Sequence, residues 1–223
     1  DVRRQARGTG SELRVGYLIS AAQSVLTPAL ARLRETNPEL RLKLRDLSPK
    51  EQIDALRAGE LDVALIGQEG MVAARDFYSR KLCSLGVCAA FSMADPLAGR
   101  RKIPLSALKG MDFIGIDEEQ MPGRNRWMTA LCRAAGFKPR FVSKVDGITN
   151  VLSLVASESA VTLLPDYFSE FAHPGVVFVP VSDVAARWDF IVLWQRGRVP
   201  ANTRALVDAL SESAVAFAGK ARP

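Results

Sequence analysis

The sequence predicts an α/β protein of two doubly wound lobes, because strand and helix patterns alternate in two separate series. The first series covers residues 13–67, and the second begins at 113 after a long extended stretch. Strands that are separated by helices pair in parallel, and the helices cover both faces of the sheet. With 223 residues, the chain is long enough for two lobes of roughly 100 residues each.

The first strand and helix are expected within residues 13–38. An apolar run at 14–19 has strand length, and Ser20-Ala21-Ala22-Gln23 then fits the S-x-x-Q capping box of a helix start. Leucines follow at helical spacing until Asn37-Pro38 stops the helix. Ligands of α/β folds bind beyond such strand ends, so this turn is the first candidate ligand contact.

The next strand, helix and strand complete the first series. Leucines that alternate with basic residues over 40–47 predict a half-buried strand. Ser48-Pro49-Lys50-Glu51 forms a second capping box, and the helix stops at Gly59. We interpret Ser48 first as a helix cap and second as a ligand contact. The apolar segment 61–66 predicts a buried parallel strand that ends at Gly67.

The middle of the chain is expected to leave one lobe and enter the other. Residues 77–91 have an extended pattern broken at Ser84-Leu85-Gly86, and a turn-rich loop follows at 95–100. Two extended crossings predict a cleft with a hinge. The predicted boundaries are 12–88 with 192–219 for lobe I, which includes the closing helix, and 89–191 for lobe II.

The second lobe repeats the alternation of strands and helices. Its helices are predicted to begin after Pro122-Gly123 and after Asp146-Gly147, with Asp146 as a cap. The predicted strands are 113–116, 141–145, 160–164 and 176–181.

Composition places the chain among ordinary soluble globular proteins. Hydrophobic residues make up 48%, charged residues 24%, and the mean hydropathy is +0.05. No apolar run approaches the roughly 20 residues that cross a bilayer. Residues 1–12 lack the apolar core of a signal peptide. We therefore expect a cytoplasmic protein without a membrane partner.

The formal charge of +6 suggests nucleic-acid binding, but its distribution does not support it. Residues 1–10 supply +2, because they hold one aspartate and three arginines. Elsewhere basic residues are interleaved with acidic ones, and only Arg100-Arg101-Lys102 forms a run. No helix-turn-helix, zinc-finger or aromatic-basic strand pattern is evident. Direct DNA binding by this stretch is not expected.

The residue types that carry metal and nucleophilic chemistry are sparse. Three cysteines, Cys83, Cys88 and Cys132, argue against a disulfide framework, and buried packing is favoured over a redox-sensing pair. The single histidine, His173, lies in a turn. Without a second imidazole or clustered thiols we expect no metal site and no catalytic triad. No enzyme activity and no cofactor are predicted.

Four segments, in the right order and at the right spacing, resemble the effector-binding domain of LysR-type transcriptional regulators, over about Gly10 to Ala218. They are 13–16 with the Ser20 turn, 61–66, the loop 95–99 with 103–108, and 155–157 leading to 162–165. The resemblance implies a type 2 periplasmic-binding-protein-like fold of two Rossmann-like lobes with a hinge. A transporter's solute-binding protein with the same fold is the alternative function.

The resemblance also implies partners. Residues 1–11 look like the end of the linker to an N-terminal winged helix-turn-helix, absent here, through which DNA is bound. Such domains pair antiparallel into homodimers, and the full-length proteins form tetramers. Binding of a small-molecule effector changes the arrangement of the dimers and so controls transcription.

The expected effector is a small organic anion, because three helix starts would offer donor amides and partial positive charge to one cleft. Ser20 matches a hydroxyl that often binds the effector carboxylate in this family. Arg124 could add a bidentate contact, the alternative being a solvated first-turn residue. The predicted effector-binding residues are Ser20, Ala21, Gln23, Ser48, Gly67, Met121, Pro122, Arg124, Ile148 and Thr149.

Overall fold

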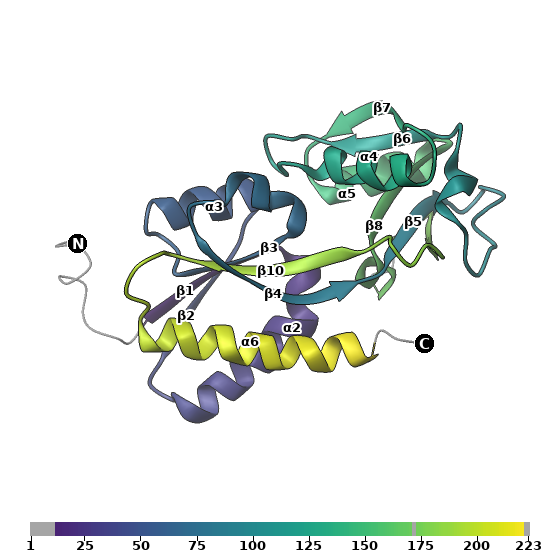
Figure 1. The fold of residues 1–223 in the computed structure, drawn as a ribbon. Helices are drawn as coiled ribbons and strands as arrows, with labels where there is room; N and C mark the ends of the chain where they lie inside the picture. Colours follow the sequence, from purple (N-terminus) through teal and green to yellow (C-terminus); the bar gives the residue numbers. More distant parts are fainter. Residues whose placement is uncertain (1–11, 171–172, 221–223) are drawn as a thin grey trace. The chain divides into compact units, whose positions relative to one another are not determined.

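The computed structural model describes residues 12–170 and 173–220 and confirms the α/β class (Figure 1). The predicted linker end at 1–11 lies outside the described residues. The chain divides into two compact units. Unit 1 takes the chain up to Ile66, Ala74–Cys83 and the part from Phe190 onward, and unit 2 takes Gly67–Ala73 and Ser84–Asp189.

The first sheet has the strand order β2-β1-β3-β10-β4. Strand β1 pairs in parallel with both β2 and β3. Helices α2 and α6 pack together on one face, and α3 lies on the other (Figure 1). The elements are β1 (Glu12–Tyr17), α2 (Ile19–Thr36), β2 (Arg41–Asp46), α3 (Pro49–Arg57), β3 (Val63–Gly67), β4 (Tyr78–Leu85), β10 (Trp188–Trp194) and α6 (Ala201–Lys220).

Strand β2 is less covered than its sequence predicts. The alternation of leucines with basic residues favoured a half-buried strand, but no residue of β2 is buried and Leu44 is 44% exposed. Strand β2 lies at the edge of the sheet, so only β1 flanks it. The predicted half-burial is therefore wrong within this chain.

A buried glutamine fastens α3 to the first sheet. Gln52 is fully buried; its Nε2 donates to the carbonyl of Leu47 at 2.9 Å, and its Oε1 accepts from the amide of Leu65 at 2.9 Å. Gly16 on β1 leaves the space, since a Cβ there would lie 3.0 Å from Gln52 Cγ. These contacts satisfy main-chain groups that helix and strand leave unpaired.

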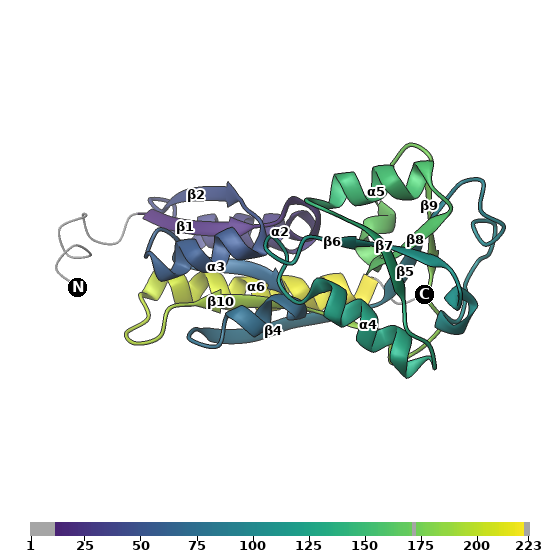
Figure 2. The ribbon, with the colours of Figure 1, turned by 90° about the horizontal axis from the view of Figure 1, so that it is seen from above.

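The second sheet has the strand order β7-β6-β8-β5-β9. Strand β6 is parallel to β7 and β8, whereas β5 is antiparallel to β8 and β9. Helices α4 and α5 cover opposite faces (Figure 2). The elements are β5 (Val87–Ser92), β6 (Asp112–Ile116), α4 (Arg124–Ala134), β7 (Arg140–Val145), α5 (Ile148–Ser157), β8 (Ala160–Pro165) and β9 (Val176–Pro180), with short 3₁₀ helices η1 (Gln68–Ala73), η2 (Leu105–Leu108) and η3 (Asp166–Glu170).

A buried side-chain amide also connects a helix to the sheet in unit 2. Asn125 of α4 donates from Nδ2 to the carbonyl of Ile116 at 2.7 Å and accepts from the amide of Ile116 at 3.0 Å. Gly115 makes room, because a Cβ there would lie 2.9 Å from Asn125 Oδ1. Both units therefore fix a helix start to a strand end with one buried amide side chain.

The unit boundaries differ from the predicted lobes in three places. Segment 67–73 belongs to unit 2, because Glu69 is hydrogen-bonded there to Arg124 and Trp188. Segment 84–88 also belongs to unit 2, since the amide of Gly86 donates to the Asp166 carboxylate at 2.9 Å. Residues 190–191 belong to unit 1. The first two boundaries therefore depend on contacts between residues that are far apart in the sequence.

The Gln52→Leu substitution should lower the free energy of unfolding by about 2–4 kcal/mol, because the buried amide of Leu65 and the partly buried carbonyl of Leu47 lose their partners. Urea denaturation measures the change. The exposed Glu35→Ala on α2 is the control and should stay within about 0.5 kcal/mol of the wild type. Equal small effects of both substitutions would contradict the role of Gln52.

Candidate functional site

Four helices begin just beyond the carboxyl ends of strands: α2 after β1, α3 after β2, α4 after β6, and α5 after β7. Within unit 1, the amide of Leu47 donates to the carbonyl of Tyr17 at 2.9 Å, so the starts of α2 and α3 follow paired strand ends. Within unit 2, the amide of Asp117 donates to the carbonyl of Val145 at 2.9 Å, so the same holds for α4 and α5. Helix amides at such edges are the usual anion-binding groups of α/β folds.

Helix α2 starts earlier than its sequence predicts. Leu18 occupies the N-cap position with extended backbone, and Ile19 is the first helical residue. The predicted capping box is therefore wrong, because Ser20 already lies inside the helix and the N-cap side chain is apolar. The side chains of residues 19–23 lie outside what the structure describes. Ligand contacts of Ser20, Ala21 and Gln23 stay predictions.

Helix α3 carries its own cap, as the sequence predicts. Ser48 Oγ accepts from the amide of Glu51 at 3.3 Å, and the Glu51 carboxylate accepts from the amide of Ser48 at 2.8 Å. The interpretation of Ser48 as a helix cap is confirmed.

The start of α4 is occupied by a carboxylate of the protein itself. Gly123 is the N-cap in a left-handed conformation with φ of +84°. Glu118 accepts from the amide of Gly123 and, at 2.8 Å, from that of Asn125. Sequence reasoning missed Glu118. The signal was a helix start whose N-cap glycine has no side chain, with an acidic residue five positions before it.

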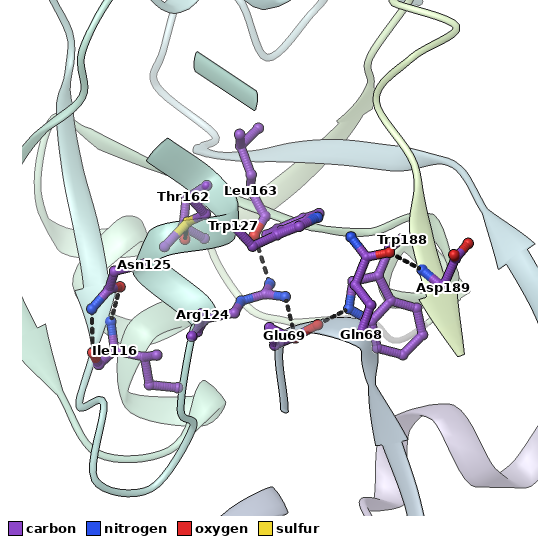
Figure 3. A network of polar contacts seen from close by, with 12 residues as sticks. Gln68, Glu69, Ile116, Arg124, Asn125, Trp127, Thr162, Leu163, Trp188 and Asp189 are labelled. Carbon is purple, nitrogen blue, oxygen red and sulfur yellow. Dashed lines mark hydrogen bonds and ion pairs between the residues drawn. The ribbon is translucent and has the colours of Figure 1, made fainter. Parts of the chain in front are cut away.

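Arg124, the first residue of α4, faces the protein interior (Figure 3). Its side chain is only 4% exposed and donates from Nη1 to Glu69 Oε1 at 3.0 Å and from Nη2 to the carbonyl of Leu163 at 2.7 Å. The guanidinium also lies 4.5 Å from the ring centroid of Trp127. The predicted bidentate ligand contact of Arg124 is therefore not supported, because the protein's own groups engage this side chain.

Glu69 is the second buried partner that sequence reasoning missed. Its Oε2 accepts from Trp188 Nε1 at 2.7 Å (Figure 3). Gly67, predicted to line the ligand site, is buried beneath this network. A Cβ on Gly67 would lie 2.4 Å from Glu69 Oε2 and 2.5 Å from the Trp188 ring. Gly67 thus makes room for protein side chains, and its contact with ligand stays a prediction.

Helix α5 begins with a glycine that has no capping side chain. Gly147 is the N-cap with φ of +72°, Ile148 is half-buried and Thr149 is exposed. Asp146, predicted to be the cap, lies one residue earlier and accepts from Asn150 Nδ2 instead, at 3.1 Å. Of the remaining predicted contacts, Met121 is buried and Pro122 half-buried in the turn before α4.

The three cysteines are buried free thiols. Burial raises the pKa of Cys132 to about 12 and also raises the pKa of Cys88, whose Sγ donates to the carbonyls of Leu164 and Pro165. Raised pKa values reduce the thiolate fraction that redox chemistry needs. Residues 12–170 and 173–220 contain no group of three side chains suited to hold a metal ion. No helix in these ranges is long and apolar enough to cross a membrane.

Comparisons with known proteins point to one family. The family described as LysR substrate binding domain matches residues 6–215. The Hca operon transcriptional activator HcaR of Escherichia coli (strain K12) is 24% identical over 201 residues, which cover 90% of this chain and 67% of HcaR. The HTH-type transcriptional regulator AlsR of Bacillus subtilis (strain 168) is 21% identical over 193 residues, or 86% of this chain and 63% of AlsR.

Solved structures share the fold. The BenM effector binding domain with its effector benzoate aligns with a TM-score of 0.79 at 18% identity, and the alignment covers 97% of each chain. The present chain spans about two thirds of the length of the curated relatives HcaR and AlsR.

The Gly123→Ala substitution should destabilise the protein far more than Gly136→Ala. Both glycines have nearly the same φ, +84° and +83°, but an added Cβ at 123 would lie 2.4 Å from the Glu69 carbonyl oxygen, and one at 136 would meet nothing within 4 Å. Backbone strain alone costs about 1–2 kcal/mol at either position. The clash adds about 1–3 kcal/mol at 123. Equal losses in urea denaturation would contradict the close approach of the Glu69 main chain.

Native protein should react slowly with a thiol reagent such as 5,5′-dithiobis(2-nitrobenzoate) at pH 8, because all three cysteines are buried. Absorbance should report three thiols after unfolding in guanidinium chloride. Reaction of native protein within seconds would favour the redox-sensing alternative.

Proposed function

This chain belongs to the LysR substrate-binding domain family, and from that membership we propose that it senses a small organic anion for a DNA-binding regulator. It is the effector-binding domain of a LysR-type transcriptional regulator. The proposal concerns which ligand it takes, which residues hold it and which partners complete the protein.

The contrast among the four helix starts carries the anion proposal. Helix α3 is capped by Ser48, which takes the amide of Glu51, and α4 by Glu118, which takes the amides of Gly123 and Asn125. The N-cap residues of α2 and α5, Leu18 and Gly147, have no side chain that accepts a hydrogen bond. Amides at a helix start attract carboxylates through hydrogen bonds and the helix dipole. BenM is described with benzoate, itself a carboxylate.

We propose that an effector carboxylate binds at a helix first turn, and each unit supplies its own candidate, α2 in unit 1 and α5 in unit 2. Ser20, Ala21 and Gln23 contribute from α2, and Ile148 and Thr149 from α5. Met121 and Pro122 supply apolar contact for the rest of the ligand. Ser48, Gly67 and Arg124 serve the protein's own structure and are left out of this assignment.

The relatives support the proposed partners. AlsR is described as an HTH-type regulator and HcaR as a transcriptional activator, so a helix-turn-helix outside this chain would bind DNA in the cytoplasm. The functional unit is proposed to be a homodimer, and a tetramer in the full-length protein. Leu44 on β2 and Val142 on β7 are 44% and 45% exposed on edge strands, where a second copy would cover them.

Ligand binding without chemistry is the proposed activity of this domain. The relatives HcaR and AlsR are transcriptional regulators, which favours a sensor over an enzyme. The same names favour a regulator over the solute-binding protein of a transporter.

Calorimetry against a panel of monocarboxylates, with benzoate included, tests the anion proposal. Ile148→Pro removes one first-turn amide at a position where proline suits the helix, and it should weaken binding of the best acid about 10- to 100-fold, the worth of a hydrogen bond to a charged group. Ile148→Ala keeps the amide and should lose much less.

The matched control is Ala201→Pro, which changes the first residue of α6. It should leave the affinity unchanged. Equal affinity of Ile148→Pro and wild type, or no binding of any acid by the wild type, would count against an anionic effector at α5.

A further inference from the structure

Glu69 joins three segments of unit 2 that are far apart in the chain. It lies in η1, within the Gly67–Ala73 segment by which the chain enters unit 2 from Ile66 and leaves again at Ala74. One carboxylate oxygen takes Arg124 Nη1 at 3.0 Å at the start of α4, and the other takes Trp188 Nε1 at 2.7 Å at the start of β10 (Figure 3). Both oxygens of the carboxylate are therefore engaged.

The Glu69 main chain also touches the turn before α4. A Cβ on Gly123 would lie 2.4 Å from the carbonyl oxygen of Glu69, so only glycine fits there. The same residue thus meets the turn twice: its main chain approaches Gly123 closely, and its side chain bonds Arg124.

Burial makes this pairing obligatory. The side chains of Arg124 and Glu69 are 4% and 3% exposed, and a charge at such depth is costly without its partner. Arg124 cannot turn outward without stranding the Glu69 carboxylate. The conformation of the turn that carries Met121 and Pro122 therefore depends on a residue in another segment.

We propose that Glu69 is a positioning residue for effector binding, which fixes the turn at 121–124 in the conformation that receives the ligand. This rests on the proposed function only in naming the effector as what the turn receives. Glu69 itself does not touch the ligand and acts through Arg124 and Gly123.

A double variant that removes both charges of the ion pair distinguishes a positioning role of Glu69 from a purely stabilising one. Glu69→Gln leaves the Arg124 charge unpaired and should lower the denaturation midpoint. The double variant Glu69→Gln/Arg124→Met removes both charges, while the side-chain amide introduced at position 69 still offers an acceptor to Trp188. Replacing a buried pair with neutral groups is often harmless to stability, so the midpoint should recover toward that of the wild type.

Two measurements on the double variant, amide exchange and ligand affinity, report on the conformation of the turn at 121–124. Amide exchange at Gly123 and Asn125, which both donate to Glu118, should be about tenfold faster, the effect of about 1.4 kcal/mol of lost local stability, with α5 amides unchanged. The affinity for the best acid of the panel should fall about tenfold although the midpoint has recovered. Glu170→Gln and Arg126→Met, both at exposed positions of unit 2, are controls and should change neither value.

The proposal would be overturned if the double variant regained the wild-type affinity and amide-exchange rates as well as the wild-type denaturation midpoint. Glu69 would then be only a stabilising group. The proposal would also be overturned if the amides of Gly123 and Asn125 exchanged at the wild-type rate in both Glu69 variants. If the wild type binds no acid, the anion proposal fails separately. Exchange at Gly123 and Asn125 then still decides whether Glu69 positions the turn, with a selective increase supporting it.

Discussion

The Glu69 carboxylate and the Arg124 guanidinium form a buried ion pair on which the organisation of unit 2 depends, because neither charge can be buried without the other. The pair binds the 67–73 segment to the start of α4, and Trp188 adds the start of β10. Gly67 and Gly123 are glycines because this packing leaves no room for a Cβ. The need to pair these two charges thus accounts for the glycines at 67 and 123, for the place of the 67–73 segment in unit 2, and for the orientation of Arg124 at the start of α4.

A second constraint concerns the donors at helix starts, each of which needs an acceptor. Helix α3 obtains a side-chain acceptor from its own capping box and α4 obtains one from Glu118, whereas the N-cap residues of α2 and α5 offer no side-chain acceptor. Capping side chains therefore satisfy the starts of α3 and α4, which leaves those of α2 and α5 as the proposed positions for an effector. This division narrows the predicted set of ten contacts to residues around α2, α5 and the turn at 121–122.

The buried amides of Gln52 and Asn125 show how the scaffold holds these helix starts in place. Each connects a helix to main-chain groups of, or next to, strands of the sheet, and each has a strand glycine beside it. A side-chain amide satisfies a donor and an acceptor at once without bringing charge into the core. The same solution in both units ties the starts of α3 and α4 to their sheets.

The sequence by itself determined the α/β class, the order of helices and strands, the Ser48 capping box and the family, because these depend on periodicity and on contacts between residues close in the chain. It misplaced the start of α2, where Leu18 and not Ser20 is the N-cap residue. It also assigned the Arg124 side chain to a ligand, whereas Glu69 and the Leu163 carbonyl engage it. Only the tertiary structure brought Glu69 to Arg124, 55 residues away, and Trp188 to Glu69, 119 residues away. Local patterns carry no information about such partners, and a buried charge takes its role from the partner that folding provides.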